Sequence, residues 1–148
     1  MPRLSLAFLL CIAALPLLAQ EPKEQAKDVK EAKEKVLKSL QGKWTVEKHV
    51  DRGEDLTKAF ARLVVTVKDN TFKSGDKPKD SFTVELDPTQ TPPTFDIIDG
   101  EKTQLGIYEL KVDTLTFCVA DAGAPRPKEL SSTKESKTVL TVLKRPAK

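Results

Sequence analysis

Apolar and polar residues alternate along most of the chain from Ser39 onward. In residues 43–50, Trp44, Val46 and Val50 are separated by polar side chains. A period of two is typical of a strand with one face buried and the other in water. The pattern predicts eight strands, at 43–50, 63–68, 71–73, 81–86, 94–98, 104–111, 114–120 and 138–144.

Turn-forming residues separate these short strands, including Asp69-Asn70 and the run from Gly75 to Pro78. About eight short strands with such spacing favour an all-β fold, as a barrel or a sandwich. Closing the sheet would remove the exposed edges of its outer strands. We therefore expect residues 39–148 to form one small antiparallel β domain, with a barrel and a sandwich both open at this point.

The first 19 residues have a different pattern. Arg3 supplies a positive charge, and Leu4 to Leu18 is apolar apart from Ser5. This run is shorter than the roughly 20 residues that cross a bilayer as a helix. The pattern is typical of a secretory signal peptide cut after Ala19, which predicts export to the periplasm or the cell exterior. A lipid anchor on Cys11 and an uncleaved anchor are the alternatives.

Residues 20–38 form a charged segment between the signal peptide and the barrel. Pairs such as Lys27 and Glu31 place opposite charges four residues apart, which supports a helix. A thin apolar stripe includes Val29, Val36 and Leu37. The segment is expected to be helical or disordered, as a solvated tether, a cap on one end of the domain, or a partner-binding helix.

Charge and composition exclude several classes of function. The chain carries 25 Lys or Arg and 22 Asp or Glu, for a net charge of +3, which lacks the strong positive charge of a nucleic-acid binder. One His and two Cys are too few for a typical metal site of four His or Cys ligands, and no cofactor is expected. After cleavage Cys118 would be the only thiol, so no internal disulfide is expected.

Candidate catalytic residues are few. His49 falls on the strand face opposite Trp44 and Val46, so we expect it outside the barrel. Cys118 is out of phase with its apolar neighbours and is expected to be packed, with no local base to activate it. Ser131-Ser132 lacks the sharp glycine-flanked turn of a hydrolase nucleophile, and no glycine-rich phosphate loop is present. We therefore do not expect an enzyme.

Several motifs resemble those of a known family. They are the opening from Leu40 to Trp44 (LQGKW), the run from Leu105 to Leu110 (LGIYEL), Arg126-Pro127 with Ser131-Ser132, and the closing stretch from Val142 to Arg145 (VLKR). Together they are similar to a lipocalin-like domain family of unknown function that is largely planctomycete. The resemblance covers about residues 39–146 and implies an exported lipocalin-like β-barrel. Val112 departs from the family, which usually has Gly there.

Three residues match the structural signature that this resemblance implies. Gly42 would let the chain turn into the barrel, Trp44 would fill the closed end, and Arg145 would cover the indole face. This arrangement is structural and implies no chemistry.

The barrel interior is the remaining candidate site. Its expected lining is apolar and consists of Trp44, Leu63, Val65, Phe72, Phe82, Val84, Phe95, Leu115 and Phe117. An eight-stranded barrel is just wide enough to be filled by side chains or to hold one small ligand. The same residues would serve either purpose, so the sequence leaves both possibilities open.

The loop from Asp121 to Lys137 is the longest connection. Arg126, Pro127 and Glu129 are its candidate contact residues, either in a solvated connection over one barrel end or in a binding loop, with an ion pair as one possible anchor. The sequence thus predicts an exported, monomeric lipocalin-like domain that binds a small apolar or amphipathic ligand. The alternative is a non-enzymatic module of the cell envelope that binds another protein.

Overall fold

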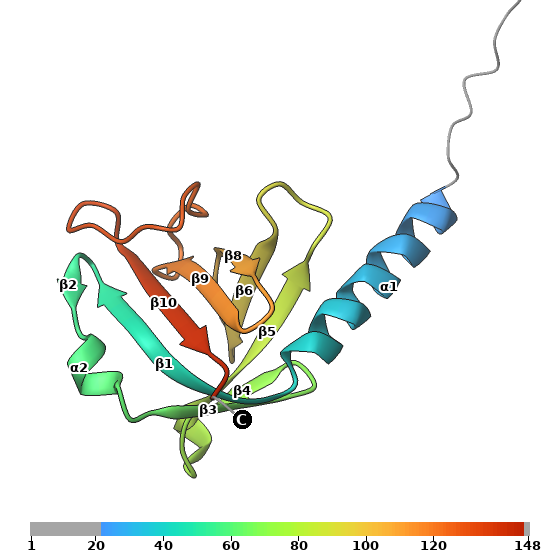
Figure 1. Cartoon of the computed structure of the whole chain (residues 1–148). Coiled ribbons are helices and arrows are strands. Elements are labelled where there is room, and N and C mark those ends of the chain that lie inside the picture. Colours follow the sequence, from blue (N-terminus) through green and yellow to red (C-terminus); the bar gives the residue numbers. More distant parts are fainter. Residues whose placement is uncertain (1–21, 147–148) are drawn as a thin grey trace, which may run out of the picture.

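A closed antiparallel β-barrel forms the body of the molecule in the computed structural model, which describes residues 22–146 (Figure 1). The barrel strands are β1 (Gly42–Asp51), β3 (Val64–Lys68), β4 (Thr71–Lys73), β5 (Ser81–Asp87), β6 (Thr94–Asp99), β8 (Gly106–Leu110), β9 (Thr114–Ala120) and β10 (Thr138–Lys144). Strand β10 pairs with both β9 and β1, which closes the sheet. The predicted all-β barrel is confirmed, and the alternation along the sequence located all eight of these strands.

Short elements that the alternation did not predict lie between the barrel strands. They are β2 (Glu54–Asp55), α2 (Thr57–Phe60), η1 (Pro78–Asp80) and β7 (Lys102–Gln104). The strand expected at 104–111 is in fact divided, because β7 pairs with one part of β6 and β8 with another. Asp69 adopts a positive φ of 55° in the β3–β4 hairpin.

The charged segment before the barrel is a helix, α1 (Pro22–Leu40). Two of the expected ion pairs form, Lys27–Glu31 at 3.8 Å and Lys30–Glu34 at 4.0 Å. The helix continues two residues further than the charged segment because Leu40 is fully buried in the core, with Val36 and Leu37 packed nearby. Its C-terminal end therefore caps the barrel, while its first turns stand clear of the sheet (Figure 1).

The main core fills the barrel interior from this capped end. Trp44, Phe72 and Phe95 are fully buried there. Residues 1–19, on which the signal peptide, its cleavage and a lipid anchor were predicted, lie outside the described residues.

Candidate functional site

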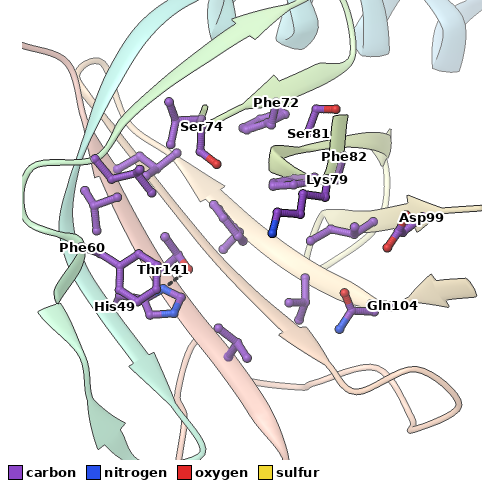
Figure 2. A pocket seen from close by; sticks show the side chains of 18 residues that line it. His49, Phe60, Phe72, Ser74, Lys79, Ser81, Phe82, Asp99, Gln104 and Thr141 are labelled. Atoms are coloured by element: carbon purple, nitrogen blue, oxygen red, sulfur yellow. Dashed lines mark hydrogen bonds between the residues drawn. The ribbon is translucent and has the colours of Figure 1, made fainter. Parts of the chain in front are cut away.

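A cavity of about 360 Å³ lies inside the barrel, away from the end that α1 caps. Figure 2 shows the side chains that line it. The lining consists of Val46, His49, Phe60, Leu63, Val65, Phe72, Ser74, Lys79, Ser81, Phe82, Ile97, Asp99, Gln104, Phe117, Val119, Val139, Thr141 and Leu143. The barrel is therefore not completely filled by its own side chains.

Stacked aromatic rings form one wall of this cavity. Phe72 stacks on Phe82 with 5.3 Å between ring centroids, and it meets Phe95 edge-on at 5.6 Å. Phe95 in turn stacks on Phe117 at 4.6 Å. Three of these rings face the cavity, while Phe95 lies behind them in the core. The result is a continuous apolar surface along which a hydrocarbon group can pack.

The opposite part of the cavity contains a polar pair. Nδ1 of His49 lies 3.0 Å from the Thr141 hydroxyl, and the imidazole packs on the Phe60 ring at 4.3 Å. Burial lowers the pKa of His49, an effect that nearby Asp51 opposes. The imidazole is consequently held in its neutral form near neutral pH, and it can exchange a hydrogen bond with a ligand without presenting a charge.

The expectation that His49 faces outward is wrong. The register between β1 and β10 shifts between Val46 and Lys48, which marks a β-bulge. One extra residue in a strand reverses the facing of every residue beyond it. Val46 and His49 therefore both line the cavity although they are three residues apart, and Val50 is turned to the outer face.

Polar side chains gather at the mouth of the cavity. They come from turns and strand ends and are Ser74, Lys79, Ser81, Asp99 and Gln104. In Figure 2 the side chain of Lys79 extends toward the middle of the cavity, whereas Asp99 lies at its edge. Sequence reasoning missed Ser74 and Lys79 because alternation gives no information about facing in turns. It missed the three residues at strand ends because only apolar side chains were expected in the lining.

The structure brings five of the nine predicted lining residues to the cavity, namely Leu63, Val65, Phe72, Phe82 and Phe117. The other four, Trp44, Val84, Phe95 and Leu115, are at most 1 % exposed and pack in the core instead. They share the inward facing of the lining residues, but other side chains lie between them and the open space. Alternation predicts which face a residue occupies, and it does not predict how deep the residue lies.

Trp44 closes the opposite end of the barrel together with Arg145. The guanidinium of Arg145 lies 4.2 Å from the Trp44 ring centroid and donates to the carbonyls of Ser39 and Gln41. The Trp44 indole donates to the Leu40 carbonyl at 2.8 Å. The two side chains thus satisfy carbonyls that the end of α1 would otherwise leave unpaired.

Gly42 permits the turn from α1 into β1. Its φ is +108°, a conformation that side chains other than hydrogen rarely adopt. A Cβ at this position would lie 3.6 Å from the Arg145 guanidinium. Gly42, Trp44 and Arg145 therefore meet at the closed end in the arrangement that the sequence resemblance implied.

Arg126 fastens the long loop between β9 and β10 to the barrel wall. Its guanidinium contacts both carboxylate oxygens of Asp96 on β6 and donates to the Gly106 carbonyl at 2.6 Å. The Gly106 N–H donates to Asp96 at 3.2 Å. Strands β6 and β8 pair directly only at Thr94 and Ile107, so this ion pair provides partners for Gly106 where the strands separate. The loop is therefore attached by an ion pair, which was one of the alternatives left open by the sequence, and it is not merely solvated.

The same loop covers an apolar row on the outer face of the barrel. Ile107, Cys118, Leu140 and Val50 are opposite one another on four adjacent strands, and Leu130 of the loop packs against them. Cys118 is fully buried, as predicted, and its thiol donates to the Ser131 carbonyl. Burial raises the pKa of this thiol, which keeps it protonated and unreactive.

The other candidate loop residues lie at the surface. Pro127 and Glu129 border a hollow formed by the loop itself. A wider depression of about 740 Å³ lies outside the barrel and is lined by Glu47, Lys48, Asp55, Thr57, Lys58 and Val142. Only Val142 is apolar there, and an open charged depression buries little of a ligand, so the barrel cavity is the better candidate site.

Neither a metal-binding cluster nor a membrane-spanning helix is found among the described residues. Between Pro22 and Pro146 no three His, Cys, Asp or Glu side chains come together in a way that could hold a metal ion. No helix in this same part of the chain has the length and apolar character needed to cross a bilayer.

Comparisons with known proteins return no relatives. No family model, no curated protein and no solved structure matches this chain. Membership of the lipocalin-like family therefore stays a prediction from the sequence motifs.

Proposed function

We propose that this barrel binds one small apolar or amphipathic molecule in its interior. The observation that carries the proposal is the cavity of about 360 Å³ with an aromatic wall and a few polar groups. Ligand sites in proteins typically measure about 300–1,000 Å³ and combine mostly apolar walls with a small number of placed polar groups. Both the size and the lining of this cavity fit that description.

The volume limits the size of the ligand. At about 30 Å³ per water-sized group, 360 Å³ accommodates roughly 12 non-hydrogen atoms. A single chain of about ten carbons with a small head meets this limit. Larger molecules would have to leave part of their surface outside the mouth.

The surface gives less support to the alternative of a protein-interaction module. Docking surfaces usually expose a contiguous apolar patch. Among the residues that the structure describes, Val64 and Val112 are the large hydrophobic side chains that are exposed. The apolar row on the outer face is already covered by Leu130 of the same chain.

We further infer that this binding takes place outside the cytoplasm. The support is the pattern of residues 1–19, with its positive start, apolar run and Ala19 at the expected cleavage site. The expected product begins at Gln20, which intact mass of the protein from an exporting host would test.

An NMR titration with 1-decanol tests the binding proposal. The expected result is saturable shifts of amides around the cavity, such as those of Phe82, Phe117 and Thr141. Val139→Phe puts a larger side chain into the cavity and should abolish these shifts. Val142→Phe is the matched control, because Val142 is on the same strand but lines the outer depression.

Two results would contradict the proposal. One is the absence of saturable shifts in the wild-type protein. The other is binding that survives Val139→Phe but is lost in Val142→Phe, which would place the ligand on the outer surface.

A further inference from the structure

The cavity has an asymmetric distribution of charge. Its ionisable lining residues are Lys79 and Asp99 at the mouth and His49 inside. Burial favours the neutral form of His49, so the interior offers no formal charge near neutral pH. A charged ligand group placed deep in the barrel would therefore lose its hydration without gaining a counter-ion, which is strongly unfavourable. Any charge on the ligand belongs at the mouth.

Lys79 is placed to meet such a charge. It lies in η1, which directly precedes β5, and its side chain extends toward the middle of the cavity (Figure 2). Within the described part of the chain, its ammonium forms no ion pair within 4.0 Å. The ammonium can therefore accept an anionic partner without breaking an existing ion pair.

Lys79 and the aromatic wall belong to the same side of the site. Phe82 follows Lys79 by three residues, and both side chains line the cavity. Phe82 stacks on Phe72, so the apolar wall continues inward from the position of the ammonium. A ligand with an anionic head and a hydrocarbon chain can contact Lys79 with its head while its chain lies along the Phe rings.

We propose that the ligand is an anionic single-chain amphiphile of about ten carbons, such as a medium-chain carboxylate. Its head pairs with Lys79 at the mouth, and its chain occupies the aromatic side of the cavity. This inference rests on the proposed function and adds the charge, size and orientation of the ligand. Asp99 at the edge of the mouth disfavours a head that carries two negative charges.

Calorimetric titrations with three ten-carbon probes test this assignment. Decanoate, 1-decanol and decylammonium share one chain and differ in the charge of the head. We expect decanoate to bind at least tenfold more tightly than decylammonium. The preference should weaken as salt rises, because the mouth is open to solvent.

Lys79→Met tests the position of the head, since it keeps much of the length of the side chain and removes the charge. Decanoate should bind about tenfold more weakly to this variant, whereas 1-decanol should change less than threefold. Lys77→Met is the matched control, because Lys77 is exposed in the same turn but does not line the cavity. It should leave all three affinities within twofold of the wild type.

The possible failures are distinguishable. Equal affinities for decanoate and 1-decanol, with no effect of Lys79→Met, would overturn the anionic head and leave the barrel as an apolar binder. Preference for decylammonium that is lost in Asp99→Asn would overturn it in favour of a cationic ligand. No binding of any probe would overturn the proposed function itself.

Discussion

Replacing Arg126 by Met should loosen the seam between β6 and β8. Direct pairing of these strands is confined to Thr94 and Ile107, and Arg126 with Asp96 supplies the partners of Gly106 beside that point. Methionine keeps much of the apolar stem but removes the guanidinium. The Asp96 carboxylate then loses its counter-ion, and the Gly106 carbonyl loses a donor.

The expected cost lies between the values for buried and exposed ion pairs. Breaking a buried pair costs about 3–5 kcal/mol, and an exposed pair contributes about 0.2–1 kcal/mol. The side chains of Arg126 and Asp96 are 32 % and 20 % exposed, so solvent screens them partly. We expect a loss of about 2–3 kcal/mol of unfolding free energy, equivalent to roughly 8–12 °C in Tm.

Urea denaturation followed by Trp44 fluorescence measures this loss. Trp44 is the only tryptophan and is fully buried, so its emission reports the folded barrel. Arg62→Met is the control, since Arg62 is exposed, and it should change the free energy by less than about 0.5 kcal/mol. Adding Asp96→Asn to Arg126→Met should recover part of the loss, because no unpaired carboxylate remains.

Thiol labelling of Cys118 under native conditions gives a second readout. Cys118 lies beneath the loop that Arg126 fastens, so Arg126→Met should increase its rate of labelling. A variant within 0.5 kcal/mol of the wild type, with unchanged labelling of Cys118, would refute the conclusion that this ion pair secures the loop and the seam.

Three further perturbations test other parts of the structure. Gly106→Ala should lower the free energy of unfolding by at least about 2 kcal/mol, because its Cβ would lie 2.5 Å from the Phe95 carbonyl oxygen. The Cβ of Gly100→Ala meets no atom within 4 Å, so this control should lose about 1 kcal/mol for its positive φ alone. Equal losses of the two variants in urea denaturation would contradict this. Arg145→Met should lower the free energy of unfolding by about 1–3 kcal/mol and shift Trp44 emission to longer wavelength. The variant loses the cation–π contact with Trp44 and the hydrogen bonds to two backbone carbonyls. An unchanged emission spectrum would argue against the contact. The pKa of His49 is lower in the folded than in the unfolded protein, so the unfolded protein binds more protons below about pH 6.5. The free energy of unfolding should therefore fall as the pH decreases through that value. His49→Gln should be less sensitive to pH over this range, and identical pH profiles of the variant and the wild type would contradict the assignment.

The positions of the strands along the chain were predictable from the sequence because most of these strands have one face in the core and one in water. The facing of His49 was not predictable, since a single bulged residue between Val46 and Lys48 reverses the alternation. The polar mouth was missed for a related reason. Lys79 lies in a turn, where the position of a side chain depends on tertiary packing and not on a repeat.

The sequence contains a sign of the apolar row on the outer face, although the prediction from alternation did not use it. Residues 117–120 (FCVA) are continuously apolar, which is typical of a strand buried on both faces. The structure shows that this part of β9 is covered on both faces, because Phe117 faces the cavity and Cys118 lies beneath Leu130. The depth of an inward residue had no such signal, which is why Trp44 and Phe95 were predicted as lining residues.

Native mass spectrometry of the protein purified from an exporting host tests the central claim most directly. The account predicts a reproducible additional mass in the range of a ten-carbon amphiphile, which disappears after unfolding and refolding of the same sample. Identical masses before and after refolding, together with no saturable binding of decanoate or 1-decanol to the refolded protein, would contradict a ligand-binding barrel.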